Sequence, residues 1–424
     1  MLLLLLFFNI SVKERGTKYP FVRLLDMKKK ERMKIYTLLL GALFVSPTQA
    51  QTMHDWENHH VLQINREPAR AAFIPFSVQK GDGSISLDGT WKFRWTPVPN
   101  ERVVNFYQTN FNDKDWTDFP VPANWEVNGY GTPIYVSAGY PFKIDPPRVM
   151  GEPKTDYTTY KERNPVGQYR RTFVLPAGWE ANGQTFLRFE GVMSAFYVWI
   201  NGERVGYSQG SMEPSEFNVT KYLKSGENQI SLEVYRYSDG SYLEDQDFWR
   251  FGGIHRSIHL IHTPDIHVRD YAVRTLPASV GDYEDFILQI DPQFSVYRGM
   301  TGKGYVLQGV LKDASGKEVA TLKGDVENML DLEHKASRMN EWYPQRGPRK
   351  MGRLSAIIKS PERWTAETPY LYKLHLTLQN GEGKVVEQIE QAVGFRSVEI
   401  KKGQLLVNGN PVRFRGVNRQ DRKG

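Results

Sequence analysis

The sequence contains no cysteine among its 424 residues. Disulfide bonds, thiolate metal sites and cysteine nucleophiles are therefore excluded. After residue 50, helix-period patterns are scarce, and no internal repeat or low-complexity tract stands out. That part of the chain also has almost no excess charge, with 46 basic against 45 acidic residues. We therefore expect no nucleic acid or other polyanionic partner.

Six of the seven net positive charges come from the first 50 residues, which have the order of a secretory signal peptide. A positive segment at 27–34 precedes an eleven-residue apolar run at 35–45, and small and polar residues then lead to Ala50. Eleven residues are too few to span a bilayer, which takes about 20, so the alternative of a membrane anchor is disfavoured. We predict translation from Met27 or Met33, cleavage after Ala50, and an exported protein, periplasmic or secreted and free of the membrane.

Strand patterns dominate the chain beyond the leader. The clearest stretches are short, rich in β-branched or aromatic residues, and partly alternating: 185–190, 195–200, 229–235 and 256–261. Turn pairs such as Asn201-Gly202 separate them. Many short strands at this spacing are typical of an antiparallel sandwich, which we place at 51–265.

A second set of strands follows a boundary at Thr263-Pro264-Asp265. Patterns at 285–290, 304–311 and 371–378 belong to a segment of about 130 residues with roughly seven strands, which suits an immunoglobulin-like sandwich at 266–393. A polar stretch at 331–353 predicts a long exposed loop within it.

A third segment, 394–424, is too short to form a domain. It predicts a hairpin on an Asn408-Gly409 turn, followed by a strand over 412–417. We expect this segment to be the opening of a further domain that the chain lacks, through a truncated gene, a frameshift or a fragment.

The stretch 238–256 is the richest in chemistry. It holds three carboxylates beside three aromatic rings: Glu244, Asp245, Asp247, Tyr242, Phe248 and Trp249. Carboxylates accept hydrogen bonds from sugar hydroxyls while rings cover apolar C–H faces, and a hard cation such as Na⁺ or Mg²⁺ would accept the same oxygens. The alternative is an acidic loop whose charges cap turns and pair with Arg250 and Arg256.

A second stretch, 121–135, places Asn124 and Trp125 on a loop rich in proline and glycine. The Asn124 amide can both donate and accept hydrogen bonds, which fits a sugar hydroxyl. Its alternative role is an Asx-turn within the loop.

Taken in chain order, the motifs resemble the N-terminal part of the β-galactosidases of glycoside hydrolase family 2. They are Trp-Glu-Asn at 56–58, Leu-Asp-Gly-Thr-Trp at 87–91, Val-Pro-Ala-Asn-Trp at 121–125, Tyr-Arg-Arg-Thr-Phe at 169–173, Tyr-Val-Trp-Ile-Asn-Gly at 197–202, Glu-Asp-Gln-Asp-Phe-Trp-Arg at 244–250, Thr-Pro-Tyr-Leu-Tyr at 368–372, Gly-Phe-Arg at 394–396 and Phe-Arg-Gly-Val-Asn-Arg at 414–419. The stretches around Asn124 and Asp247 resemble β-galactosidases more than β-glucuronidases or β-mannosidases.

The resemblance implies a fold and a set of site residues. The fold is a jelly-roll sugar-binding domain, an immunoglobulin-like domain and a (β/α)₈ barrel, of which this chain holds the first strand. Asn124 and Asp247 would contact the galactosyl unit, and Asp247 would also help to hold a sodium ion. Arg419 ends the segment matching the first barrel strand, whose carboxyl end faces the substrate. Gln420 stands where the family usually has a histidine that helps to bind the galactosyl hydroxyls. Its amide could still hydrogen-bond to the substrate there, but it cannot carry a proton as imidazole does.

The resemblance also implies retaining hydrolysis of terminal β-D-galactosyl residues of oligosaccharides or glycans. That reaction uses two glutamates about 5–5.5 Å apart. In the family both lie deep in the barrel, with the Mg²⁺ ligands, so we expect the chain to lack them and to be inactive alone. Glu244 and Asp247 share one loop, and nothing in the sequence sets them across a glycosidic bond. We expect the intact enzyme to use Mg²⁺ and Na⁺ and to form a homo-oligomer.

Two alternatives stay open. One is a carbohydrate-binding β-protein without hydrolytic activity. The other is a family-2 enzyme of different specificity, a β-glucuronidase or a β-mannosidase.

Overall fold

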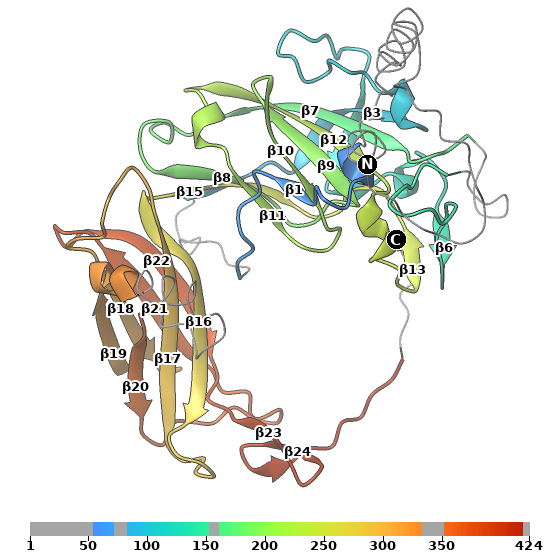
Figure 1. Ribbon diagram of the computed structural model, residues 1–424. Coiled ribbons are helices and arrows are strands. Elements are labelled where there is room, and N and C mark those ends of the chain that lie inside the picture. The colour runs from blue at the N-terminus through green and yellow to red at the C-terminus, as the bar shows by residue number, and fades with distance from the viewer. Residues whose placement is uncertain (1–53, 72–82, 152–160, 333–351, 419–424) are drawn as a thin grey trace, which may run out of the picture. The chain divides into compact units, whose positions relative to one another are not determined.

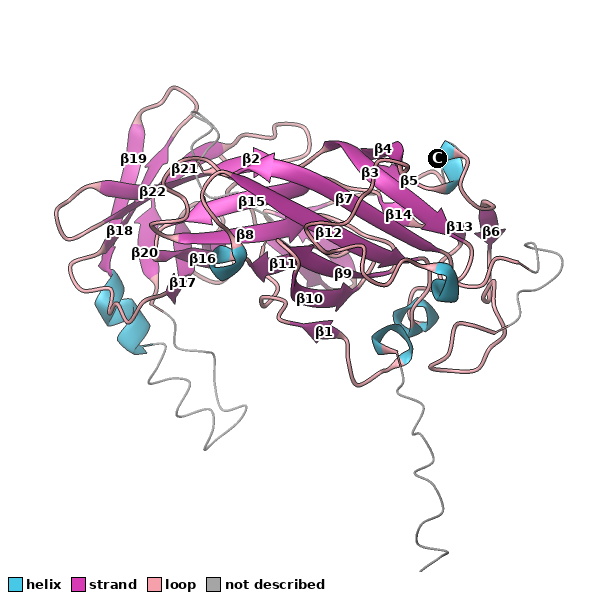
Figure 2. Cartoon of the chain, turned by 90° about the horizontal axis from the view of Figure 1, so that it is seen from above, coloured by secondary structure: helices cyan, strands magenta, loops and turns pink. Residues whose placement is uncertain are grey.

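The structure is a computed structural model that describes residues 54–71, 83–151, 161–332 and 352–418. β-Strands make up nearly all of the regular secondary structure in this part of the chain (Figure 1, Figure 2), which confirms the prediction of an all-β protein. No helix within these ranges is long and apolar enough to cross a bilayer. The predicted leader and nearly all of the loop predicted at 331–353 lie outside the described residues.

Two antiparallel sheets form the first sandwich. The seven-stranded sheet has the order β1 (Gln63–Ile64), β10 (Glu203–Gln209), β9 (Ala195–Ile200), β12 (Glu227–Tyr235), β7 (Val166–Val174), β3 (Gly89–Thr96) and β4 (Thr117–Val121). The four-stranded sheet has the order β11 (Ser215–Asn218), β8 (Gln184–Phe189), β15 (Ile258–Thr263) and β2 (Ser84–Ser86). Each neighbouring pair within these sheets is antiparallel.

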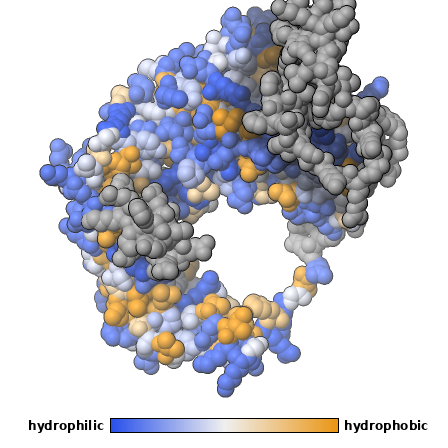
Figure 3. Space-filling view, in the orientation of Figure 1, coloured by the Kyte–Doolittle hydropathy of each residue, from blue (hydrophilic) through white to orange (hydrophobic). Residues whose placement is uncertain are grey.

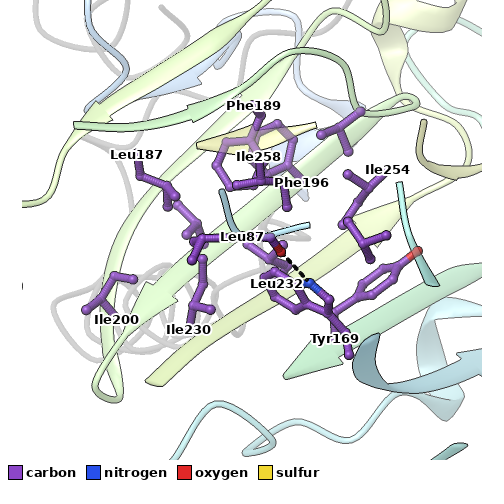
Figure 4. Close-up of a cluster of buried hydrophobic side chains, with 14 of the residues drawn as sticks. Leu87, Tyr169, Leu187, Phe189, Phe196, Ile200, Ile230, Leu232, Ile254 and Ile258 are labelled. Atoms are coloured by element: carbon purple, nitrogen blue, oxygen red, sulfur yellow. Dashed lines mark hydrogen bonds between the residues drawn. The ribbon is translucent and has the colours of Figure 1, made fainter. Parts of the chain in front are cut away.

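Side chains from both sheets meet in one apolar core. Figure 4 shows Leu187 and Ile258 of the four-stranded sheet in the same cluster as Ile230 and Leu232 of β12. Successive residues of a strand point to opposite faces, so every second residue of β12 reaches this core. Trp91 belongs to the same core, and its indole Nε1 donates to the Leu87 carbonyl at 2.9 Å.

The outer face of the seven-stranded sheet is covered as well. A second cluster of mostly aromatic residues lies there, with members Trp56, Phe106, Trp116, Phe142, Val149, Val166, Ala195, Tyr197, Trp199, Tyr207, Tyr235 and Tyr237. Several of them come from loops between strands. The 3₁₀ turns are η2 (Asp55–Glu57), η3 (Pro99–Glu101), η4 (Glu126–Asn128), η5 (Thr220–Tyr222) and η6 (Asp239–Tyr242).

The described part of the second sandwich has seven antiparallel strands in two sheets. One sheet has the order β16 (Ile266–Pro277), β17 (Phe286–Val296) and β20 (Leu354–Ile358). The other has the order β19 (Glu318–Asp325), β18 (Val306–Lys312), β21 (Tyr372–Gln379) and β22 (Val385–Val393), and a short helix covers 326–332. β19, the fourth strand of this sandwich in chain order, pairs with the third strand, β18. The strands are thus divided between a sheet of three and a sheet of four.

The last described segment forms a small sheet of β23 (Val398–Lys401), β24 (Gln404–Val407) and β25 (Asn410–Pro411). Val407 pairs with Asn410, and Asn408 and Gly409 have φ of 50° and 78°, which confirms the predicted hairpin turn. The Asn408 side chain donates to the Trp364 carbonyl at 3.0 Å and anchors the turn.

The strand predicted over 412–417 is wrong for this structure. Val412 N still donates to the Leu405 carbonyl at 3.0 Å, but residues 412–418 form no regular element and Phe414 is 79 % exposed. A strand needs backbone partners, and among the described residues the only strand beside β25 is β24.

Figure 3 shows apolar surface over the second sandwich and near β23.

Candidate functional site

The two stretches that the sequence singled out pair with each other twice. β5 (Ala123–Asn124) pairs with β14 (Gly253–Ile254), and β6 (Ile134–Val136) pairs with β13 (Phe248–Arg250). Asn124 thus lies on a two-residue strand opposite Gly253, where the sequence predicted a loop. Figure 1 and Figure 2 show β6 and β13 side by side at one end of the first sandwich. The pairing brings residues more than 100 positions apart into one surface.

Trp125 fastens the first ribbon, β5 with β14, to the core. Its side chain is fully buried and donates through Nε1 to the Tyr169 hydroxyl, while its backbone N donates to the Gly252 carbonyl at 3.0 Å. A Cβ added at Gly167 or at Gly252 would lie 2.5 or 2.4 Å from the indole. Both positions therefore need glycine, because the ring fills the space that a side chain would take.

Arg236 joins the two ribbons from inside. Its guanidinium lies 3.2 Å from the Glu126 carboxylate, and both side chains are 1 % exposed. Its Nη2 donates to the Thr132 carbonyl at 2.7 Å and to the Arg250 carbonyl at 2.6 Å. One planar cation thus binds the turn after β5, the approach to β6 and the end of β13, which is geometry that a guanidinium fork suits.

The buried carboxylates around Arg236 complete this support. Burial raises the pKa of Glu126, while the charge of Arg236 and the Gly252 amide act to lower it. The Gly252 N donates to Glu126 Oε2 at 3.0 Å, and Glu162 accepts from the Thr132 hydroxyl at 3.2 Å. Sequence reasoning missed all three charged residues. The available signal was Glu126 itself, a carboxylate directly after a buried tryptophan.

Two of the three predicted carboxylates, Glu244 and Asp245, each accept two hydrogen bonds from neighbouring loop residues. Glu244 accepts from Ser211 N at 2.7 Å and from Ser211 Oγ at 2.6 Å. Asp245 accepts from Arg250 Nη2 at 2.6 Å and from Gly139 N at 3.1 Å. The structural alternative is therefore confirmed for this pair, including the expected contact with Arg250. Arg256 does not take part in the way expected, since it donates to the Met212 carbonyl at 2.9 Å.

Asp247 differs from its two neighbours. It lies in the bend before β13, is exposed, and accepts a hydrogen bond from the Tyr135 hydroxyl across the second ribbon, β6 with β13. Asn124 is half-buried, and its backbone carbonyl accepts from the Asn128 side chain at 2.8 Å. The structure thus presents one carboxylate and one amide on adjacent ribbons. Both are groups that bind hydroxyls.

The remaining predicted site residues cannot be placed. Arg419 and Gln420 lie outside the described residues. Within the described ranges, no group of three or more His, Asp or Glu side chains is arranged to hold a metal ion. The Asp247 carboxylate is one hard oxygen ligand of the kind that Na⁺ accepts.

Comparison with known proteins identifies the two sandwiches. Residues 85–264 match the family model described as glycosyl hydrolases family 2, sugar binding domain, and residues 266–396 match that described as glycosyl hydrolases family 2. A β-galactosidase of Priestia megaterium is 37 % identical over 398 residues, covering 91 % of this chain and 36 % of that protein. A β-galactosidase of Yersinia enterocolitica is 36 % identical over 379 residues, covering 87 % and 34 %.

Solved structures share the fold at lower sequence identity. A calcium-binding mutant of Bacteroides uniformis β-glucuronidase 2 has a TM-score of 0.58 at 23 % identity, covering 79 % of this chain and 35 % of that one. A β-glycosidase from Bacteroides vulgatus has a TM-score of 0.57 at 20 % identity, covering 79 % and 36 %. The chain spans about a third of the length of the bacterial β-galactosidases that it matches. Its two sandwiches match the family's sugar-binding domain and the domain after it, and the chain therefore belongs to glycoside hydrolase family 2.

Proposed function

We propose that this chain is the galactoside-binding part of an exported, retaining β-galactosidase that removes terminal β-D-galactosyl residues from oligosaccharides or glycans. The observation that carries the proposal is the double pairing of 121–135 with 238–256, which puts Asn124 and Asp247 on neighbouring ribbons. The names of the relatives that are 36–37 % identical support galactose as the sugar.

Asn124 and Asp247 have separate roles in this proposal. The Asn124 amide donates to and accepts from ring hydroxyls, and the Asp247 carboxylate accepts from one hydroxyl and offers an oxygen to Na⁺. The Tyr135 hydroxyl holds the carboxylate in place from the opposite strand. A bound Na⁺ would supply positive charge that orients sugar oxygens beside Asp247.

The described carboxylates of the loop do not form a catalytic pair. Glu244 and Asp245 are occupied by Ser211, Arg250 and Gly139, so neither is free to serve as an acid or a nucleophile. We therefore expect sugar binding from this chain and hydrolysis only from a longer protein that supplies two glutamates about 5–5.5 Å apart.

Hydrolysis assays test the proposal. The chain, alone and within the longest protein that its gene encodes, is assayed on chromogenic β-galactosides, β-glucuronides and β-mannosides. We expect activity on galactosides from the longer protein only. Asp247→Ala should lower kcat/KM on galactosides by about 10- to 150-fold, because a hydrogen bond to a charged group contributes about 1.5–3 kcal/mol.

Asp118→Ala is the matched control, since Asp118 is an exposed carboxylate of the same sandwich that pairs with Lys92 at 2.8 Å. Its kinetics should not change. A strict preference for glucuronides, or an Asp247→Ala enzyme with unaltered kcat/KM, would refute the proposed function. Hydrolysis by the chain alone would refute the division between binding and chemistry.

A further inference from the structure

The second ribbon has two faces with different chemistry. Tyr135 lies directly opposite Trp249, so these two side chains share a face, and the residues that flank β13 contact them: Asp247 accepts from the Tyr135 hydroxyl, and Phe251 stacks on Trp249. Phe248 and Arg250 project to the other side, where the guanidinium lies 4.7 Å from the Phe248 ring. The face that carries Asp247 is therefore also the face that carries three aromatic rings.

Those rings form a corner. Trp249 and Phe251 are nearly parallel, with ring centroids 5.8 Å apart and planes at 6°. Tyr135 stands edge-on to Trp249, with centroids 5.6 Å apart and planes at 66°. Tyr135 is 43 % exposed, although a large apolar ring usually gains free energy from burial. Trp249 is only partly buried. The corner thus has an indole floor, a phenol wall and a carboxylate at the end of the wall.

The geometry points to this corner, Tyr135 with Trp249, as a stacking site for one pyranose ring of galacto configuration. In a β-galactopyranose the axial C4 hydroxyl leaves the hydrogens of C3, C4 and C5 together on one face, forming a continuous apolar patch. In the gluco epimer the C4 hydrogen lies on the opposite face, and the patch is broken. An indole plane accepts the continuous patch, and the Asp247 carboxylate accepts a ring hydroxyl at its rim.

Tyr135 acts twice in this site. Its ring forms the wall, and its hydroxyl donates to Asp247 and so fixes where the sugar hydroxyl must lie. Sugar selection then depends on the spacing between floor and carboxylate, which the three residue pairs of the second ribbon set. This inference rests on the proposed function, because it names the element that selects galactose over its C4 epimer.

Binding to the 424-residue chain tests it without hydrolysis. Methyl β-D-galactopyranoside and methyl β-D-glucopyranoside are titrated, and saturation-transfer NMR records which sugar hydrogens contact the protein. We expect the galactoside to bind more tightly, with the strongest transfer at H3, H4 and H5. Trp249→Ala should weaken galactoside binding about tenfold and remove the preference, as expected for the loss of about 1.4 kcal/mol of stacking.

Two further variants separate the contribution of the Trp249 ring from that of the Tyr135 hydroxyl. Trp249→Leu keeps apolar bulk in the ribbon without an aromatic plane and should behave as Trp249→Ala does. Tyr135→Phe keeps the wall and should preserve the contact pattern at H3 to H5 while weakening affinity. Tyr107→Ala is the matched control, because Tyr107 stacks on Trp199 at 5.2 Å in the aromatic cluster on the outer sheet face and should leave both glycosides unaffected. Circular dichroism confirms that each variant is folded.

The outcomes distinguish this site from the proposed function. Unchanged galactoside affinity in both folded Trp249 variants, with binding lost in Asp247→Ala, overturns the corner and leaves the proposed function standing. A folded wild-type chain that binds neither glycoside, or binds both equally, also overturns the corner. The hydrolysis assays above then judge the function independently.

Discussion

The two sandwiches differ in what covers their sheets. In the first, β9 is buried along its whole length, with Val198 facing the core between the sheets and Trp199 facing the outer aromatic cluster. In the second, β21 alternates, with Leu374 and Leu376 buried and the residues between them more exposed. Within the described residues, the first module therefore has three packed layers and the second has two. Loop residues such as Phe106 and Trp116 complete the extra layer, and the candidate site lies on the two ribbons, β5 with β14 and β6 with β13.

The largest expected effect tests the outer layer. Trp199 is 9 % exposed, and it stacks on Tyr107 and lies 5.4 Å from Phe106. Trp199→Ala should lower the free energy of unfolding by about 3–5 kcal/mol, as for other large-to-small changes at buried sites. Urea unfolding followed by circular dichroism measures it.

Ile357→Ala on β20 is the matching change on the outer face of the second sandwich. Ile357 is 60 % exposed, so the change should stay within about 0.5 kcal/mol. Equal costs at the two positions would contradict the contrast between three layers and two.

A smaller effect concerns the buried cation. Arg236→Lys keeps the charge but cannot reach Glu126, Thr132 and Arg250 with one planar group. The loss should cost about 1.5–3 kcal/mol, the range for a hydrogen bond that involves a charged group.

Arg274→Lys in the second sandwich is its control, because Arg274 is half-exposed and pairs with Asp291 at 3.0 Å. Asp291 is buried, but it also accepts from Arg353 at 2.6 and 2.9 Å, so Arg274→Lys should cost about 0–1 kcal/mol. If both lysine variants unfold at the same urea concentration as the wild type, Arg236 is not the support described above.

The smallest expected change in the free energy of unfolding at acidic pH is that of replacing Glu387. This buried glutamate of the second sandwich accepts from Val268 N at 2.7 Å, and burial raises its pKa from 4.5 to about 8. The folded state then binds its proton more tightly than the unfolded state. The associated stability is complete below pH 4.5 and is lost as the pH rises through about 8.

Glu387→Gln keeps an acceptor for Val268 and cannot ionise. Its free energy of unfolding should change little at pH 5 and should fall less than that of the wild type between pH 5 and pH 8.5. Parallel slopes for the two proteins would show that Glu387 ionises freely when folded.

Strands and tight turns could be read from the sequence because their signals are local. The pattern at 195–200 corresponds to β9, and Asn201-Gly202 forms the turn to β10 with φ of 51° and 85°. Such turns require positive φ, which asparagine and glycine tolerate. The strand predicted at 412–417 is wrong although its apolar pattern is that of a strand. A strand also needs backbone partners, and these are not present for this segment among the described residues.

The site could be predicted only in part. Asn124 and Asp247 stand out by residue type and resemblance, but the pairing of their ribbons depends on contacts between distant segments. Arg236 carries no local signal, because an arginine looks the same in sequence whether it is solvated or buried. Tyr135 could have been found by counting in twos along both strands once their register was known.

The second ribbon consists of three residue pairs and joins no larger sheet in the described part of the chain. Its outward side chains contribute little to either core, so they can be exchanged with small cost to folding. If the proposed stacking site is correct, substitutions at 135, 247 and 249 would change which epimer is preferred while the scaffold stays intact. Under that proposal, sugar selectivity could change by substitution in a small ribbon without a large cost to either core.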